Sequence, residues 1–547
     1  MTILTSIPRT IVGRAMRPFQ IIAVAWLLSA SVTWAQDKID ADVLFTSARI
    51  FDGVNPQPTL GDVAIKDDRI VAVGKFETGS VGWRIDCTGL TLTPGFIDLH
   101  NHSDGYITKR ATRSATNFLT QGCTTLVTGN CGSGPIDMLG FEKRIKGAGV
   151  GPNIAHLIPQ GTLRREVVGE DNRKATTDEI RRMRALAALA MNNGAWGMST
   201  GLIYVPGSFT PTDELIAIAE IVGEHNGIYA SHMRSEGKNV LVAVDEAMRI
   251  GRDADVPVHI SHFKSVGRDS WGLVREAIRV IEKNRAAGMR ITADQYPYIA
   301  SSTSLRATLV PGWARAGGKS EMVRRLNDPD KSQRVRDAIQ KSLERKDNGS
   351  RVQIARHRNQ PDWAGKRISQ IAKLEDTTPL EVVVQILKNG GASVVNFSMQ
   401  EEDVRHVMQV PWVATASDGR AYLPGGDRPH PRNYGTFPRK LGFYALREKT
   451  ITEAQAIRSC TTLPAEILGM SDRGRIQTGF AADITIYDPK TIIDNSTFEQ
   501  PHQHSTGIRH VFVNGSAVVF DGTPTGNRPG KLLKRPTPSN RERAGRR

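Results

Sequence analysis

Hydrophobic and polar positions alternate in short runs near both ends of the chain. Between about residues 40 and 93, the segments DVLFTSARIFDG, DVAIKDDRIVAVG and LTLTPG place apolar residues at every second position and are separated by Gly, Asp and Asn. The pattern returns late in the chain, in ADITIYDP and HVFVNGSAVVFDG. Such alternation predicts short strands with one buried face. The two flanks most simply pair with each other, which predicts one small β-sandwich built from residues 36–93 and 471–530.

Between these flanks, over residues 94–470, continuous apolar runs alternate with amphipathic stretches. The segments ATTDEIRRMRALAALAMNNG and TPTDELIAIAEIVGEHNG open with Thr or Asp caps and acidic first turns, which are typical of helices. Eight apolar runs are expected to be strands: GFIDLH, TTLVTGNCG, NIAHLIPQG, GAWGMSTGL, GIYASHMR, VPVHISHFK, RITADQYPY and VPWVATASDG. Eight strand–helix units predict an α/β fold, a (β/α)8 TIM-like barrel.

The stretch from about 300 to 410, between the seventh and eighth predicted strands, is too long for a simple crossover. Its segment EMVRRLNDPDKSQRVRDAIQKSLERKD has the composition of charged surface helices. We therefore expect an insertion at this point, which could serve as a lid over the barrel.

Length and charge change this picture only at the two termini. A chain of 547 residues is too long for one ordinary core, which agrees with several domains. Of the formal net charge of +16, residues 1–35 and 531–547 together contribute +9, which leaves +7 for the rest. No interleaving of basic and aromatic residues marks a nucleic-acid groove, so we expect no nucleic-acid partner. The basic tail 531–547 is expected to be solvated and disordered.

The first 35 residues have the layout of a secretory signal peptide. Arg14 and Arg17 precede the apolar run IIAVAWLLSA, and a cleavage point follows Ala35. The run is too short and wrongly flanked for a membrane-spanning helix, and no cysteine near the cleavage point could carry a lipid anchor. We therefore expect an exported protein, periplasmic or secreted, without a stable membrane anchor. A start at Met16 in place of Met1 would give a more typical signal.

The polar residues with metal-binding side chains fall at the ends of the predicted strands. The carboxyl ends of barrel strands form the working face, and residues two apart in a strand point the same way. The candidates are His100 and His102 on strand one, Cys131 on strand two, His232 on strand five, His262 on strand six and Asp418 on strand eight. Imidazole, thiolate and carboxylate are the ligands that zinc prefers, so together these residues predict a site for one metal ion or two close together.

Each of these residues taken alone has a plainer interpretation. A single histidine at a strand end is more often a hydrogen-bonded structural residue, and Cys131 could be a small buried hydrophobe. With only four cysteines, at 87, 123, 131 and 460, the chain does not look like a disulfide framework. A second His-x-His, at His502 and His504, has no converging partners in the sequence and is interpreted as a surface pair.

The motifs PGFIDLHNH, SHMRSEG, ISHFK, SDG and GRIQTGFAADITIYDP resemble those of the metal-dependent amidohydrolase superfamily over nearly the whole mature chain. Within it, GNCG, STGLIYVPG, DQYPY and HPRNYGTFPR are similar to the N-acyl-D-amino-acid deacylases. This resemblance implies hydrolysis of N-acyl-D-amino acids with a zinc cofactor. It also implies that Cys131, His232 and His262 hold one tightly bound zinc, whereas His100, His102 and Asp418 form a weaker second position.

The resemblance also implies roles in catalysis and substrate binding. Asp418 would accept a proton from the attacking water and return it to the departing amine. Lys264, Tyr296 and Arg432 would bind the α-carboxylate of a small N-acyl amino acid. The loop GRAYLPGGDRPHP, just before Arg432, is somewhat long for the family.

Two further readings remain open at this point. The same metal site could serve a dipeptide with a carboxy-terminal D-residue or a cyclic amide. Cyclic-amide enzymes usually carry a bridging lysine on strand four, and GAWGMSTGLIYVPG contains none. A non-catalytic exported binding protein on a barrel scaffold is the alternative from a different class.

Overall fold

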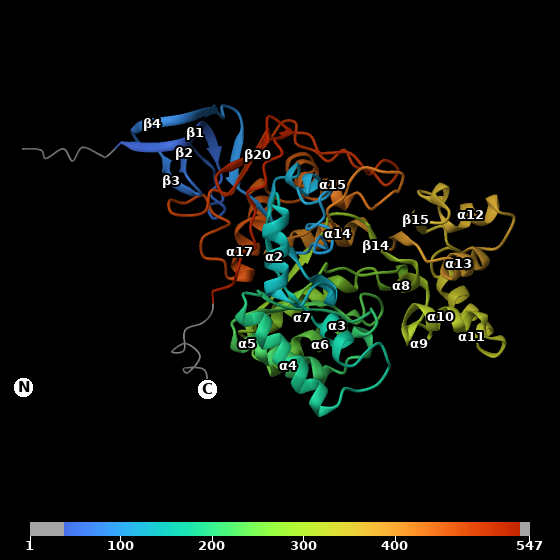
Figure 1. Cartoon of the computed structure of the whole chain (residues 1–547). Helices are drawn as coiled ribbons and strands as arrows, with labels where there is room; N and C mark the ends of the chain where they lie inside the picture. Colours follow the sequence, from blue (N-terminus) through green and yellow to red (C-terminus); the bar gives the residue numbers. More distant parts are fainter. Residues whose placement is uncertain (1–37, 537–547) are drawn as a thin grey trace, which may run out of the picture.

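In the computed structural model, which describes residues 38–536, both ends of the chain contribute to one β-sheet (Figure 1). The two parts join where β18 (Ile484–Tyr487) pairs antiparallel with β5 (Thr91–Pro94). The other strands are β1 (Ile39–Ile50), β2 (Thr59–Lys66), β3 (Arg69–Gly74), β4 (Thr78–Asp86), β19 (Ile508–Val513), β20 (Ser516–Phe520) and β21 (Thr523–Pro524). They follow the order β21-β20-β19-β18-β5-β1-β2-β3, and β4 pairs with β1.

This nine-stranded sheet curls so that its two halves face each other. Phe45 of β1 and Phe512 of β19 are not neighbours in the sheet, yet their ring centres lie 5.0 Å apart. In the same way, the rings of Trp83 of β4 and Phe520 of β20 lie 4.7 Å apart. The apolar side chains of the alternating pattern pack against one another in this interior. One curled sheet, rather than the two separate sheets of the expected sandwich, therefore encloses the core.

The middle of the chain forms parallel strands in two sheets rather than in one closed sheet. The first sheet contains β6 (Phe96–Asp98), β7 (Cys123–Thr128) and β8 (Asn153–His156). The second contains β9 (Ile158–Pro159), β10 (Gly197–Gly201), β11 (Ile228–His232), β12 (Val258–Ile260), β13 (Ile291–Gln295) and β17 (Val413–Thr415). Backbone hydrogen bonds join the sheets on both sides: Trp196 N–H donates to His156 O, and Asp418 N–H donates to His100 O.

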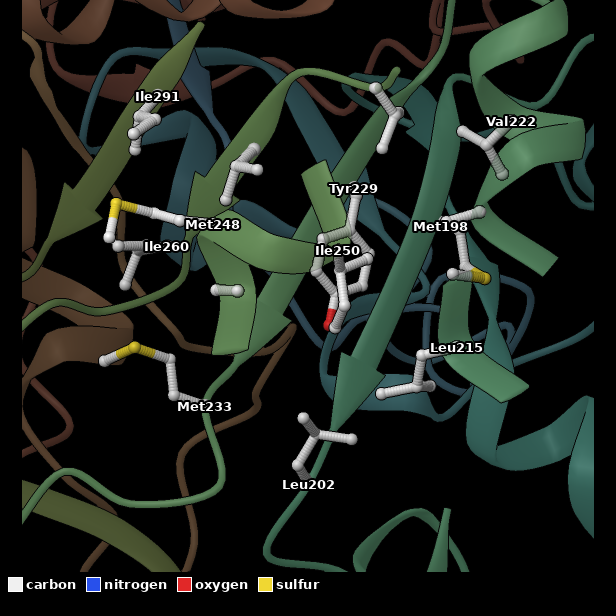
Figure 2. Close-up of a cluster of buried hydrophobic side chains, with 14 of the residues drawn as sticks. Met198, Leu202, Leu215, Val222, Tyr229, Met233, Met248, Ile250, Ile260 and Ile291 are labelled. Carbon is white, nitrogen blue, oxygen red and sulfur yellow. The ribbon is translucent and has the colours of Figure 1, made fainter. Parts of the chain in front are cut away.

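Helices cover the outer face of these strands (Figure 1). They are α1 (Thr116–Leu119), α2 (Met138–Ala148), α3 (Gln160–Val167), α4 (Thr177–Asn192), α5 (Thr212–Glu224), α6 (Val240–Asp253), α7 (Leu273–Ala286) and α14 (Glu401–Met408). Figure 2 shows part of the core between them, where Leu215 and Val222 of α5 lie near Met198 of β10 and Tyr229 of β11. Full burial of one such side chain contributes about 1.5–3 kcal/mol, so this interface is a major source of stability.

The helix starts follow the predicted capping chemistry in one case and depart from it in another. At α4, Thr176 accepts a hydrogen bond from the Glu179 backbone, and the Glu179 carboxylate accepts one from the Thr176 backbone. This reciprocal arrangement satisfies two amides that the helix itself leaves free. At α5 the N-cap is Pro211, which has no side-chain acceptor, so this helix start lacks a side-chain cap. The acidic residue Glu214 of its first turn pairs with the buried Arg164.

Residues 300–397, most of the expected insertion, form a compact unit beside the strands, whereas the remainder returns to them as α14 (Figure 1). Its sheet has the order β14-β16-β15, from β14 (Ala300–Ser304), β15 (Val352–Arg356) and β16 (Ser393–Phe397). Its helices are α8 (Leu305–Leu309), α9 (Gly312–Arg315), α10 (Gly318–Asn327), α11 (Pro329–Glu344), α12 (Ile368–Leu374) and α13 (Pro379–Lys388). Val335, Ile339 and Leu343, four residues apart on α11, are fully buried. The unit therefore has its own core and is more than a set of charged surface helices.

The C-terminal part returns to the strands and corrects one expectation. After β17 come α15 (Arg432–Pro438), a π-helical segment (Arg439–Arg447), α16 (Glu453–Cys460) and α17 (Thr462–Leu468). Residues 531–536 are not a disordered tail: Ile154 N–H donates to Lys531 O, and Leu533 N–H donates to Ile154 O. The Trp196 indole also donates to Leu533 O at 2.8 Å. These hydrogen bonds hold the segment against β8, and the rest of the basic tail lies outside the described residues.

All four cysteines are buried and free, in agreement with the absence of a disulfide framework. Within residues 38–536, the helices lack the combination of length and apolar character that crossing a membrane requires. The predicted signal peptide at 1–35 lies outside the described residues.

Candidate metal centre and active site

The side chains of the first predicted strand are positioned by a buried carboxylate that the sequence interpretation missed. Asp98, the last residue of β6, accepts hydrogen bonds from the Asn101 side chain and from the backbone and hydroxyl of Ser417, beyond β17. Burial outweighs these bonds and raises the pKa of Asp98 to about 6. Asp98 thereby holds the ends of two strands together, and His100 and His102 follow directly.

Cys131 lies at the centre of the histidines. Its Sγ is 3.3 Å from His100 Nε2, 3.5 Å from His232 Nδ1 and 3.6 Å from His262 Nε2. It belongs to the short 3-10 turn Asn130–Gly132 after β7. These four residues come from four separate parts of the chain, at or just beyond the ends of β6, β7, β11 and β12, and the parallel strand ends bring them to one point.

Three of the predicted ligands have left-handed backbone conformations. The φ angles are +51° at Cys131, +39° at His262 and +51° at Asp418. Such angles are uncommon for residues other than glycine and cost about 1–3 kcal/mol each, so the surrounding structure must impose them. At His262, the Asp294 carboxylate accepts a hydrogen bond from the backbone N–H at 2.6 Å.

Asp294 and Glu236 are two acidic residues of the site that the sequence interpretation also missed. The Asp294 carboxylate lies 2.8 Å from His259 Nε2 and 3.5 Å from His100 Nδ1. The sequence signal that could have identified Asp294 is its carboxylate inside the apolar predicted strand RITADQYPY. Glu236, in the motif SHMRSEG, lies 2.8 Å from His262 Nδ1.

Lys264 and Glu236 form a buried ion pair beside His262. Lys264 Nζ lies 2.5 Å from Glu236 Oε1 and 2.8 Å from His262 Nδ1. Despite burial, which acts in the opposite direction, Lys264 and His262 hold the pKa of Glu236 well below its usual range. The ammonium of Lys264 is therefore already paired within the protein.

Asp418 joins the histidine cluster to Arg432. Its Oδ1 lies 3.1 Å from His102 Nε2, and its Oδ2 lies 2.8 Å from Arg432 Nη1. Arg432 also lies over the Tyr296 ring, with its guanidinium carbon 4.8 Å from the ring centre. The long loop before Arg432 thus still brings this residue beside Asp418.

The charges around the cluster favour the ionised forms of the Cys131 thiol and the Asp418 carboxyl. Burial alone raises the pKa of the Cys131 thiol, but His100 and His232 reverse this effect and bring its pKa well below the ordinary value. Burial also opposes ionisation of Asp418, yet Arg432 and His102 hold the pKa of this carboxyl well below its usual range. Burial lowers the pKa of His102, but Asp418 and Cys131 outweigh it and raise this pKa to about 9.

The geometry fits a metal ion. Typical Zn–S and Zn–N bonds of about 2.3 and 2.1 Å in a tetrahedral site separate sulfur from nitrogen by roughly 3.6 Å. The three distances from Cys131 Sγ to the histidines, 3.3–3.6 Å, match this separation. His232 Nε2 is buried without a hydrogen-bond partner among the described residues. The possible ligand groups are His100–Cys131–His262, His100–His102–Asp418 and His232–Glu236–His262.

All six predicted ligands therefore lie in one connected cluster, and Glu236 adjoins it. The structure brings Cys131 as close to His100 as to His232 and His262. The division into a tight site with Cys131, His232 and His262 and a weaker site with His100, His102 and Asp418 stays a prediction.

A cavity of about 920 Å³ opens onto the cluster. His102, Cys131, His262 and Asp418 line it together with Arg432. Of the three predicted carboxylate anchors, Arg432 alone reaches the cavity wall. Lys264 and Tyr296 lie behind it, both buried.

Tyr296 and Tyr204 extend the polar surroundings of the cluster. The Tyr296 hydroxyl has no hydrogen-bond partner among residues 38–536 and is free to receive one. Tyr204, which also lines the cavity, packs edge-on against His232 at 5.0 Å and was not foreseen.

The second His-x-His lies outside the cluster. His504 is exposed, as expected for a surface residue. His502 corrects the interpretation: its side chain is 11% exposed, because Asp427 on the loop before α15 and Tyr434 of α15 contact it.

The chain is similar to known proteins over most of its length. The model of the amidohydrolase family matches residues 84–519. D-aminoacylase from Alcaligenes xylosoxydans xylosoxydans is 34% identical over 522 residues, 91% of this chain and 99% of that protein. N-acyl-D-aspartate deacylase from the same organism is 34% identical over 90% of this chain and 95% of that protein.

A solved structure is similar over nearly the whole chain. It is N-acyl-D-glutamate deacylase from Bordetella bronchiseptica, complexed with zinc and a phosphonate inhibitor that mimics the tetrahedral intermediate of the reaction. It is 28% identical to this chain, has a TM-score of 0.78, and the match covers 91% of this chain and all of that one. Since the family model spans most of the chain and full-length relatives share a third of its residues, the chain belongs to the amidohydrolase family, and within it to the N-acyl-D-amino-acid deacylases.

Proposed function

We propose that this protein hydrolyses the amide bond of N-acyl-D-amino acids and releases a carboxylate and a free D-amino acid. The observation that carries this proposal is the position of Asp418, 3.1 Å from His102 and 2.8 Å from Arg432, between the ligand cluster and the cavity. The substrate class is supported by the relatives, which are named as deacylases of D-amino acids, D-aspartate and D-glutamate.

Zinc is the proposed cofactor, with Cys131, His232 and His262 at the tight site. His100, His102 and Asp418 would hold a second, weaker ion. When bound, such an ion would lower the pKa of the attacking water and supply positive charge that polarises the scissile carbonyl. Support comes from the mixed thiolate and imidazole donor set and from the zinc complex of the relative from B. bronchiseptica.

The protein's own residues move the proton and hold the substrate. Asp418 accepts a proton from the attacking water as the water oxygen bonds to the carbonyl carbon. When the carbon–nitrogen bond breaks, Asp418 returns that proton to the amide nitrogen, so the products are a carboxylate and an amine. This base-then-acid role typically contributes about 10²–10⁴ to the rate. Arg432 can bind the α-carboxylate with two parallel hydrogen bonds, supported by Tyr296 and Lys264.

We further infer that the two parallel sheets together form one closed (β/α)8 barrel. We also infer that the protein is exported after cleavage behind Ala35. The first inference is supported by the hydrogen bonds that join β6 to the end of β17 and β8 to β10. The second is supported by the Arg-flanked apolar run near the start of the sequence. Amino-terminal sequencing of protein from the periplasm or medium should give Gln36 as the first residue, and a cytosolic protein that retains Met1 or Met16 would contradict export.

The decisive test compares paired N-acetyl-D- and N-acetyl-L-amino acids on protein whose zinc content is measured in the same preparation. We expect hydrolysis of the D forms, a marked preference over the L forms, and loss of activity on chelation. Equal rates on both enantiomers, or on substrate amides that lack the carboxylate, would contradict the proposal.

A further inference from the structure

The cavity above the metal cluster carries a strong excess of positive charge. Its lining contains seven basic residues, whereas Asp418 is the one acidic residue of the lining among residues 38–536. The basic residues are Arg165, Arg306, Lys319, Arg356, Arg358, Arg420 and Arg432. Over the whole chain, by contrast, 72 basic residues are offset by 56 acidic ones, so the excess in the cavity is a local feature.

Most of this charge is unpaired. Arg432 is neutralised by Asp418 at 2.8 Å, and Arg165 pairs with Glu170 at 2.9 Å. The remaining five, which we call the basic rim, have no carboxylate within 4.0 Å in the part of the chain that the structure describes. The basic rim consists of Arg306, Lys319, Arg356, Arg358 and Arg420. Arg315, behind Arg306, has its pKa lowered by burial and then by the Arg306 charge, which reflects like charges held close together.

The insertion at 300–410 supplies four of the five residues of the basic rim. Arg306 lies on α8, Lys319 on α10, Arg356 at the end of β15, and Arg358 just beyond it. All four are exposed, in contrast to the ligands of the metal cluster, which are buried except for the partly exposed His102 and Asp418. The cavity thus has a metal-binding floor built by the barrel strands and a cationic outer wall built mainly by the insertion.

One anionic group on the substrate does not account for this wall. The α-carboxylate needs a single guanidinium, and Arg432 lies at the floor, beside Asp418. The cavity volume of about 920 Å³ is near the upper end for small-molecule sites, so an N-acetyl amino acid of about a dozen non-hydrogen atoms leaves much of it unfilled. Unpaired cations around a concave site raise the local concentration of anionic ligands.

We propose that the preferred substrates of this enzyme carry a second anionic group, besides the α-carboxylate, which the basic rim binds. This inference rests on the proposed function and specifies its substrate class. The second anion can belong to an acidic D-amino-acid side chain or to an acyl group that ends in a carboxylate, and the chemistry of recognition is the same in both cases.

Three substrates test the proposal on the zinc-loaded protein: N-acetyl-D-leucine, N-acetyl-D-glutamate and N-succinyl-D-leucine. We expect kcat/KM to be at least tenfold higher for one or both dianionic substrates. A higher kcat/KM for N-acetyl-D-glutamate would place the second anion on the side chain, and a higher kcat/KM for N-succinyl-D-leucine would place it on the acyl group. If N-acetyl-D-leucine is cleaved as efficiently as both dianionic substrates, the basic rim does not select substrates, although the deacylase function stands.

A matched pair of double variants assigns the preference to the basic rim. Two unit charges about 6 Å apart in water-like surroundings attract enough to change binding about threefold. Arg356→Gln with Arg358→Gln should therefore reduce the advantage of the dianionic substrate about tenfold, mainly through KM. The control, Lys341→Gln with Lys373→Gln, removes the same charge from exposed positions of the insertion outside the cavity and should leave the ratio unchanged. Equal effects of both double variants, or no effect of the first, would overturn the assignment.

Salt and direct binding complete the test. Raising the ionic strength should raise KM for the dianionic substrate more than for N-acetyl-D-leucine, because exposed charges are screened. Calorimetric binding to the zinc-loaded Asp418→Asn variant measures the same preference without turnover. If no D substrate is hydrolysed but N-acetyl-D-glutamate still binds tenfold more tightly than N-acetyl-D-leucine, the basic rim is supported and the deacylase function is wrong.

Discussion

The replacement Asp418→Asn separates proton transfer from metal binding. Asparagine has nearly the same shape as aspartate and can still hydrogen-bond to His102, but it cannot take a proton from water. If Cys131, His232 and His262 hold the tight zinc, the variant should fold and retain that ion. Its kcat should fall by about 10²–10⁴, which corresponds to roughly 3–5 kcal/mol of transition-state stabilisation.

The structure also indicates the effect of this replacement on substrate binding. Arg432 loses its carboxylate partner at 2.8 Å, so the nitrogen that paired with Asp418 also becomes available to the substrate carboxylate. The KM should consequently stay the same or fall, and the loss should appear in kcat. Removing the charge also leaves Arg432, with a side chain only 5% exposed, without its ion pair, so some loss of thermal stability is expected.

The assay measures steady-state hydrolysis of an N-acetyl-D-amino acid, zinc per protein chain and the melting temperature on the same sample. Asp427→Asn is the matched control: Asp427 lies on the same loop, pairs with His502 and makes no contact with the ligand cluster. Near-normal kcat with zinc bound would refute the role of Asp418 in proton transfer. Loss of the tight zinc would instead mean that Asp418 is a primary ligand.

Three further predictions follow from the buried groups. Cys131→Ala should lose zinc together with activity, since the sulfur lies at ligand distance from three histidines; stoichiometric zinc in the variant would contradict this. Glu236→Gln should lower the melting temperature markedly, because it leaves the buried Lys264 ammonium without its carboxylate, and Glu236→Gln combined with Lys264→Met should recover part of the loss. Burial lowers the pKa of Lys440 from 10.5 to about 8, so this group should make the free energy of unfolding rise between pH 8 and about 10.5. Lys440→Met should abolish that rise in denaturant titrations and stabilise the protein at pH 7 by roughly 3 kcal/mol; an unchanged pH dependence would contradict a buried, charged Lys440.

The sequence by itself determined the class of fold and the chemistry of the site. Strand periodicity identified the strands at both ends, and the apolar runs identified the parallel strands of the middle, because burial imposes a pattern on each element locally. The six ligands could be selected because a polar side chain at the end of an apolar strand conflicts with the surrounding pattern; they are His100, His102, Cys131, His232, His262 and Asp418. The capping box at Thr176 was likewise a local signal.

The tertiary structure alone decided which side chains meet. Asp98 and Ser417 are 319 residues apart in sequence, and Asp418 and His102 are 316 apart, so no local pattern relates them. The paired state of Lys264 with Glu236 and the cationic wall from the insertion likewise depend on how distant segments pack. The order of residues 531–536 arises from backbone hydrogen bonds to β8, which a basic composition does not reveal. Local sequence patterns thus specify which residues are buried and which chemistry they carry, whereas partners, charge balance and cavity shape arise only when distant strands and loops come together.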